Sequence, residues 1–170
     1  MSWSGPRRTD GSMAEEIIRL AYDEARAALR EQDATLANVR NRATGLLAAA
    51  AVGTSFAASV GLLNTDPGRG ATFPGWAGWT LFALVTVIGV GVLVVLWPVA
   101  RWGYGPQPAT LLGHASADAD ATLRQATEAM IVAIASNDRL LTRRMTTYRI
   151  TAGVLMVEIL TLVAALLIRG

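Results

Sequence analysis

The feature that most constrains this chain is an apolar run near its end, residues 148–168, with a carboxylic acid, Glu158, at its midpoint. A helix of about 20 apolar residues crosses a hydrocarbon core of roughly 30 Å, and this run has that length. Charge is most costly at the depth of Glu158, so we expect this residue to be protonated or to have a partner. The chain is therefore predicted to be an integral membrane protein.

Composition narrows the classes of function. With 170 residues, 52% of them hydrophobic, the chain is too apolar for an ordinary soluble domain and too short for more than one membrane module. There is no cysteine, and His114 is the single histidine, so thiolate metal sites and histidine clusters are excluded. No enzyme motif and no basic run long enough to track nucleic acid is present. We expect neither an enzyme nor a nucleic-acid-binding protein, and no metal or cofactor.

Two further spans are predicted upstream. Residues 43–63 carry no charged side chain, and residues 76–100 form a second apolar stretch beyond a proline- and glycine-rich hairpin at 64–75. Tryptophans mark both ends of the second span, because their rings prefer the membrane interface. The helical rise between the inner pair is roughly 27 Å, which matches a bilayer core. These tryptophans are Trp76 and Trp79 at one end and Trp97 and Trp102 at the other.

Two long helices in water are expected beside the spans. Ser12 and Glu15 have capping-box spacing, which predicts a helix over 13–42 after a disordered tail at 1–12. A second helix is predicted over 116–147, and no glycine or proline separates it from the span at 148–168. The predicted fold class is therefore all-α: one domain at 13–170, with three transmembrane helices and two long cytoplasmic helices in a bundle.

Arginine placement predicts the orientation. The N-terminal side and the stretch between the second and third spans hold most of the arginines, whereas the hairpin has only Arg69 and the C-terminus only Arg169. The positive-inside rule then places the N-terminus in the cytoplasm and the C-terminus outside.

The spans contain small and polar residues that could join helices. Small residues recur at every fourth position of the first span, which predicts close helix packing. Thr54, Ser55, Thr86, Thr161 or the Glu158 of a second subunit are the expected partners of Glu158. Two alternatives stay open for this acid: it holds helices together in the protonated form, or it lines a polar path in an oligomer. The small residues are Gly45, Ala49, Gly53, Ala57 and Gly61.

Basic residues close both cytoplasmic helices. If the helices pair, these arginines converge at the membrane surface, where their planar forks suit a nucleotide phosphate or an anionic lipid headgroup. The alternative is ordinary juxtamembrane charge that sets topology and touches lipid. The arginines are Arg40, Arg42, Arg139, Arg143 and Arg144.

The order of these features resembles a family. The segments DATLANVRNRATGLLAAAAVGTSFAASVGLL, LWP and SNDRLLTRRMTTYRITAGVLMVEI make residues 20–168 similar to the small transmembrane effectors of Pycsar antiphage systems and to the broader SLATT class. The resemblance implies a bacterial inner-membrane protein that forms a homo-oligomer. It also implies activation by cCMP or cUMP from a partner cyclase, followed by disruption of the membrane and abortive infection.

The resemblance assigns roles to the residues above. The arginine set would bind the phosphate of the cyclic nucleotide, and Glu158 with Gly45, Gly53 and Gly61 would serve assembly. The alternative function is a constitutive helical adaptor without a nucleotide ligand. An ion or proton carrier that uses Glu158 is a third hypothesis, which would require oligomerisation because three spans make a poor pathway.

Overall fold

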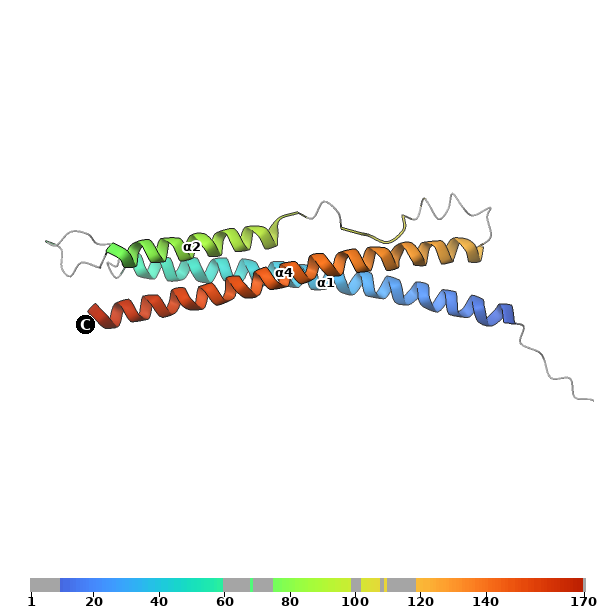
Figure 1. The fold of residues 1–170 in the computed structure, drawn as a ribbon, viewed down its shortest axis with the longest axis horizontal. Coiled ribbons are helices and arrows are strands. Elements are labelled where there is room, and N and C mark those ends of the chain that lie inside the picture. Colours follow the sequence, from blue (N-terminus) through green and yellow to red (C-terminus); the bar gives the residue numbers. More distant parts are fainter. Residues whose placement is uncertain are drawn as a thin grey trace, which may run out of the picture. The chain divides into compact units, whose positions relative to one another are not determined.

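The structure is a computed structural model that describes residues 10–59, 68, 75–98, 102–107, 109 and 119–169. The long helices of this part of the chain are α1 (Asp10–Ser59), α2 (Gly75–Leu96) and α4 (Ala119–Arg169) (Figure 1). No strand occurs among the described residues. The prediction of an all-α bundle is confirmed.

Helices α1 and α4 are each continuous. The predicted helix at 13–42 runs without a break into the described part of the predicted first span, and the predicted helix at 116–147 joins the predicted third span in the same way. Residues 10–12, which the sequence assigns to a disordered tail, are helical. Residues 1–9, the predicted cap Ser116 and His114 lie outside the described residues.

The chain forms two compact units, and α1 and α4 contribute to both. The head unit comprises Met1–Thr35 and Val99–Leu141, and the span unit comprises Leu36–Pro98 and Thr142–Gly170. In the head unit, Ala25 and Leu29 of α1 pack against Met130 of α4. In the span unit, buried residues of α1, α2 and α4 form one core cluster around Ile88 and Val92 of α2.

Burial along α1 and α4 follows steps that alternate between three and four residues. This seven-residue repeat is the spacing of coiled coils, in which side chains interlock along one seam. The buried or half-buried seam positions of α1 are Ala25, Leu29, Gln32, Leu36, Val39, Ala43, Leu46, Ala50, Gly53 and Ala57. Those of α4 are Leu123, Thr127, Met130, Ile134, Asn137, Leu141, Arg144, Tyr148, Thr151, Leu155, Glu158, Leu162 and Ala165.

The small residues that pack in α1 are partly different from those predicted. Gly45 and Ala49 are exposed, whereas Ala43 and Ala50 are buried. Steps of four residues drift by about 40° each time around a helix, whereas alternating steps of three and four stay on one face. The four-residue pattern therefore leaves the seam, and Gly61 lies outside the described residues.

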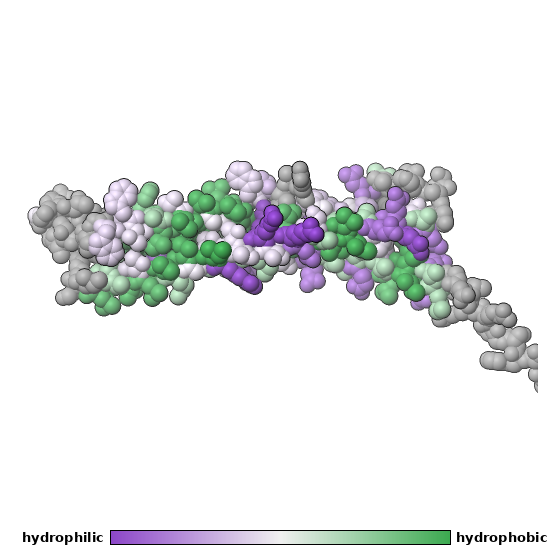
Figure 2. Space-filling view, in the orientation of Figure 1, coloured by the Kyte–Doolittle hydropathy of each residue, from purple (hydrophilic) through white to green (hydrophobic). Residues whose placement is uncertain are grey.

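Two described helices are long and apolar enough to cross a membrane. They are Trp76–Leu96 in α2 and the apolar part of α4, within Ala119–Leu167. The predicted first span at 43–63 is not among them, because its described part ends at Ser59 and residues 60–63 are not described. Figure 2 shows hydrophobic side chains gathered over the helices of the span unit.

Helix α2 ends earlier than the predicted limit of residue 100. Leu96 is its last residue, and Pro98 follows two positions later. A proline disfavours helical geometry in the residue before it, which here is Trp97. The Trp97 amide still donates to the Leu93 carbonyl over 2.8 Å and closes the final turn. Trp76, Trp79 and Trp97 are exposed, as residues at a membrane interface would be.

Candidate functional site

Arg144 of α4 caps the C-terminal end of α2. Its Nη1 donates to the Val95 carbonyl and its Nη2 donates to the Trp97 carbonyl. Carbonyls in the last turn of a helix have no partner within the helix, and they carry the negative end of its dipole. Only 9% of the Arg144 surface is exposed. This arginine therefore satisfies the end of α2 and joins two helices of the span unit.

Arg40 of α1 lies close to Arg144, but part of its hydrogen-bonding capacity is not used. Its Nε is buried and has no hydrogen-bond partner among the described residues. Burial lowers the pKa of Arg144, which precedes the predicted third span, and the positive charge of Arg40 lowers it further. Arginine stays charged in proteins even so, because its ordinary pKa lies far above neutral pH. Two like charges are therefore held together at the end of α2.

The span unit holds an excess of positive charge. Among its described side chains Glu158 is the only carboxylic acid, and no ion pair joins it to an arginine. Arg144 and Glu158 lie on one helix, separated along its axis by roughly 21 Å. No described carboxylate therefore neutralises the arginines of this unit. They are Arg40, Arg42, Arg143, Arg144 and Arg149.

Glu158 is buried inside the span unit. Only 1% of its surface is exposed, and its Oε2 has no hydrogen-bond partner in the described part of the chain. It lies opposite Gly53, where an added Cβ would be 3.7 Å from Oε1. Within the protomer, Glu158 therefore faces α1 and not the outer surface of the bundle.

The hydroxyls expected to bind Glu158 are used elsewhere. Thr54 donates to the Ala50 carbonyl at 2.9 Å, and Thr86 and Thr161 donate to the carbonyls four residues before them at 2.8 and 2.7 Å. Ser55 is exposed. Threonines in apolar helices commonly satisfy their own helix in this way. The predicted hydroxyl partnership is therefore replaced by bonds within each helix.

Thr151 marks a close approach of α2 to α4. A Cβ added at Gly91 of α2 would lie 2.2 Å from the Thr151 Oγ1, far inside contact distance. Thr151 is itself buried, and its hydroxyl donates to the Thr147 carbonyl at 2.8 Å. Only glycine fits at residue 91 with the helices this close.

Four buried polar residues share one position of the α4 repeat. Asn137, Arg144, Thr151 and Glu158 are each seven residues apart, and all are buried. We name this set the polar seam. In the span unit, Arg144 contacts the end of α2, Thr151 lies against Gly91 of α2, and Glu158 lies against Gly53 of α1. The seven-residue spacing is readable from the sequence, but helical hydropathy alone does not separate seam residues from exposed ones.

Asn137 begins the polar seam in the head unit and holds a non-helical segment, residues 102–107, which we call the strap. Its Nδ2 donates to the Gly103 carbonyl, and its Oδ1 accepts from the Gly103 amide, both at 3.0 Å. A Cβ added at Gly103 would lie 2.7 Å from the Ala133 Cβ, so the strap backbone lies directly on α4. Asn137 is fully buried.

Trp102 secures the strap to α1. Its Nε1 donates to the Asp33 Oδ1 at 2.6 Å, and only 9% of its surface is exposed. The prediction that Trp102 marks a membrane interface is wrong, because its ring packs inside the head unit and its indole N–H is satisfied by a carboxylate. The spacing of tryptophans along a sequence shows where an interface could lie, but it does not show which way each ring points.

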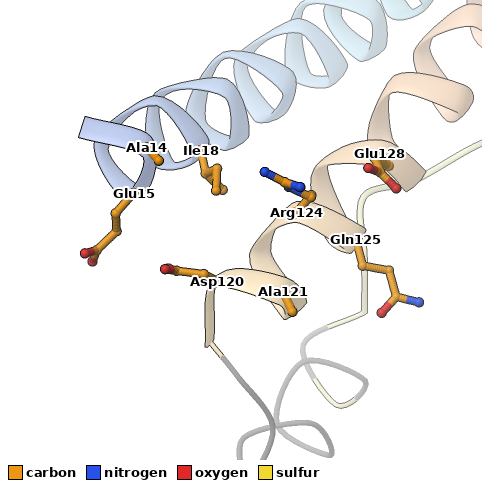
Figure 3. Close-up of a pocket in the computed structure, with 8 residues that line it drawn as sticks. All are labelled: Ala14, Glu15, Ile18, Asp120, Ala121, Arg124, Gln125 and Glu128. Carbon is orange, nitrogen blue, oxygen red and sulfur yellow. The ribbon is translucent and has the colours of Figure 1, made fainter. Parts of the chain in front are cut away.

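A recess opens in the head unit between the first turns of α1 and α4 (Figure 3). Its volume is about 480 Å³, and Arg124 extends across it toward Ile18. Carboxylates outnumber guanidinium groups in its lining, so it does not suit a phosphate. The lining residues are Ala14, Glu15, Ile18, Asp120, Ala121, Arg124, Gln125 and Glu128.

The structure separates the predicted phosphate residues into two groups. Arg40 and Arg144 lie together, with Arg144 buried and Arg40 half-buried, whereas Arg42 and Arg143 are exposed in the span unit. Arg42 donates from its Nε to the Asn38 Oδ1 at 3.1 Å. Arg139 belongs to the head unit and is exposed there. Comparison with protein-family models, curated proteins and solved structures finds no match.

Proposed function

We propose that this chain is a bacterial membrane effector of abortive infection. A cyclic pyrimidine nucleotide binds its cytoplasmic arginines, and the activated protein then disrupts the inner membrane. One observation carries the proposal: the span unit collects arginines without a described carboxylate near them. Such a surface favours a ligand that brings negative charge, and a nucleotide phosphate supplies it in a form that arginine binds through paired hydrogen bonds. Arg40, Arg42, Arg143 and Arg144 of the span unit are the proposed phosphate residues.

The proposal includes three spans. The apolar end of α1 would cross the membrane together with α2 and the C-terminal part of α4, with the N-terminus inside and the C-terminus outside. The packing of α1 against α2 and α4 in the span unit supports this topology. A helix that packs along two membrane spans over several turns is expected to lie at the same depth in the membrane as they do.

Activation requires two arrangements of the spans with different affinity for the nucleotide. A ligand shifts an equilibrium only by its difference in affinity for the two states. Burying Glu158 without a partner weakens the closed packing, which keeps the free-energy gap to an open arrangement small. In an open oligomer the same carboxyl could face water, and this would favour the disrupted state.

Dye release from liposomes tests the proposal. The purified protein is reconstituted with a trapped dye, and cCMP or cUMP is added, with the linear nucleotides CMP and UMP as matched controls. We expect release with one cyclic nucleotide only, and loss of release in the Arg143→Gln variant. Absence of both binding and release with cCMP and cUMP would remove the effector function.

The alternative is a constitutive adaptor without a nucleotide ligand. An exposed apolar stripe on α1 favours it, since Met13, Ile17 and Leu20 lie on one face and are all about half exposed or more. If this stripe recruits a protein, then Ile17→Glu should abolish that association and leave the dye-release response unchanged. A nucleotide-independent association lost in Ile17→Glu, with no dye release in any condition, would favour the adaptor.

A further inference from the structure

We infer that Arg40 and Arg144 form a preorganised anion-binding site at the end of α2. The site binds a phosphate group, which is supplied by the headgroup of an acidic phospholipid. This site shares Arg40 and Arg144 with the proposed nucleotide site, but lipid binding needs no nucleotide, so the two proposals can be tested separately. The observation that carries it is the buried Nε of Arg40, a donor with no partner in the described part of the chain. It lies beside a second guanidinium that is itself nine-tenths buried.

Charge balance points to an anion at this position. The end of α2 offers Arg144 about half an elementary negative charge through its dipole, which leaves most of the charge of the pair without compensation. Burying uncompensated charge is costly, so a counter-ion would stabilise the buried Arg144 and the buried Nε of the half-exposed Arg40. The described carboxylate of the span unit, Glu158, is too far along α4 to serve. A phosphate group would supply that counter-ion.

Donor geometry agrees with this assignment. A guanidinium carries five N–H groups, and Arg144 directs one from each Nη to a carbonyl of the α2 end. The remaining N–H groups of Arg144 and the buried Nε of Arg40 have no hydrogen-bond partner among the described residues. Several donors from two planar forks match the oxygens of a phosphate better than they match a halide or a single carboxylate.

Depth in the membrane indicates where the phosphate comes from. The site lies at the end of a helix that is long and apolar enough to cross the membrane, beside Trp97, which is 63% exposed. An exposed tryptophan at the end of a span marks the interfacial layer, and phospholipid phosphates lie in that layer. The cytoplasmic leaflet carries anionic lipids that attract arginines close to the surface. A lipid phosphate is therefore present at this depth at high local concentration.

The test measures lipid affinity and thermal stability of the full chain in neutral detergent micelles. Phosphatidylglycerol is titrated in one arm, phosphatidylcholine in a second, and inorganic phosphate without acidic lipid in a third. The variants are Arg40→Gln and Arg40→Lys, and the matched control is Arg149→Gln, an exposed arginine of the same unit. We expect phosphatidylglycerol, and not phosphatidylcholine, to raise the melting temperature of the unmodified protein.

The variants distinguish specific lipid binding at Arg40 and Arg144 from non-specific attraction of acidic lipids to surface arginines. Loss of a charge-assisted bond should weaken phosphatidylglycerol binding by roughly tenfold or more in Arg40→Gln. Loss of a surface charge should weaken it by at most roughly fivefold in Arg149→Gln. Arg40→Lys keeps the charge and loses the buried Nε, so it should resemble Arg40→Gln. Arg40→Gln removes like-charge repulsion, so it should fold and be at least as stable in phosphatidylcholine.

Each result decides the matter. Stabilisation by inorganic phosphate that is lost in Arg40→Gln supports the site and assigns it to soluble phosphate. Equal weakening in Arg40→Gln and Arg149→Gln overturns it, as does an unmodified protein that responds to neither phosphatidylglycerol nor phosphate. Nucleotide-dependent dye release would be unaffected by these last two outcomes, so failure of the lipid site can be told from failure of the proposed function.

Discussion

The head unit and the span unit use the same helix-packing repeat but treat buried polar groups differently. Among the described residues of the head unit, Asn137 and Trp102 both have partners, and the buried atom without one, the Gln32 Oε1, belongs to a neutral amide. Among those of the span unit, the buried atoms without a partner belong to Arg40 and Glu158, which are ionisable. A buried neutral group without a hydrogen bond costs about 1–3 kcal/mol, and a charged one costs more. The span unit therefore retains groups that a ligand or a rearrangement would stabilise.

The head unit and the span unit also differ in the balance of their charged side chains. The described side chains of the head unit include more carboxylates than arginines, and those of the span unit include one carboxylic acid beside five arginines. The carboxylates of the head unit are Glu15, Glu16, Asp23, Glu24, Glu31, Asp33, Asp120, Glu128 and Asp138, and its arginines are Arg19, Arg26, Arg30, Arg124 and Arg139. The head unit therefore has more described carboxylates than arginines, whereas the arginines of the span unit have one described carboxylic acid among them, at the far depth of Glu158.

The largest expected effect is loss of the cap on α2. Arg144→Leu removes two charge-assisted hydrogen bonds to carbonyls at the helix end, and we expect unfolding free energy to fall by about 3–5 kcal/mol. Chemical denaturation in detergent micelles measures it, with Arg143→Leu, an exposed neighbour, as the control. Equal effects of the two variants would contradict the cap.

The equivalent test in the head unit removes the anchor of the strap. Asn137→Ala leaves the Gly103 amide and carbonyl without their partner, and we expect a loss of about 2–4 kcal/mol. Hydrogen exchange at the Gly103 amide should accelerate in this variant and not in Ser136→Ala, whose side chain is exposed. Unchanged exchange in Asn137→Ala would show that the strap is held by other contacts.

Close packing of α2 on α4 gives an intermediate effect. Gly91→Ala places a methyl group against the Thr151 hydroxyl, and overpacking of this kind costs about 1–3 kcal/mol. Gly153→Ala is the control, because nothing lies within 4 Å of its added Cβ. The double variant Gly91→Ala with Thr151→Ala should recover most of the loss. Failure of the double variant to recover would place the clash elsewhere.

The smallest expected effect has the opposite sign. Glu158→Leu replaces an unpartnered buried acid by an apolar side chain, and we expect a gain of about 1 kcal/mol in stability. Thermal unfolding in micelles measures it, with the same change at the exposed Glu128 as the control. A loss of stability in Glu158→Leu would mean that the carboxyl has a partner in the folded protein.

Much of the architecture could be predicted from the sequence, because long runs without glycine or proline predict α1 and α4 directly. The predicted end of α2 is too late because the apolar run continues past Pro98, whereas the helix ends at Leu96. The interface prediction for Trp102 is wrong because its partner, Asp33, is distant in sequence and no local pattern joins them. The pairing of Arg40 with Arg144 could be anticipated only as a cluster, because the capping of α2 by Arg144 depends on tertiary packing.

The seven-residue spacing of the polar seam makes the length of α4 as constrained as its composition. Within the span unit, one residue inserted between Arg144 and Thr151 would turn every later side chain by about 100° around the helix axis, relative to Arg144. The contact at Gly91 and the buried acid would then leave their positions together, while the α2 cap would stay. Natural variants of this helix should therefore gain or lose residues in whole repeats, or not at all.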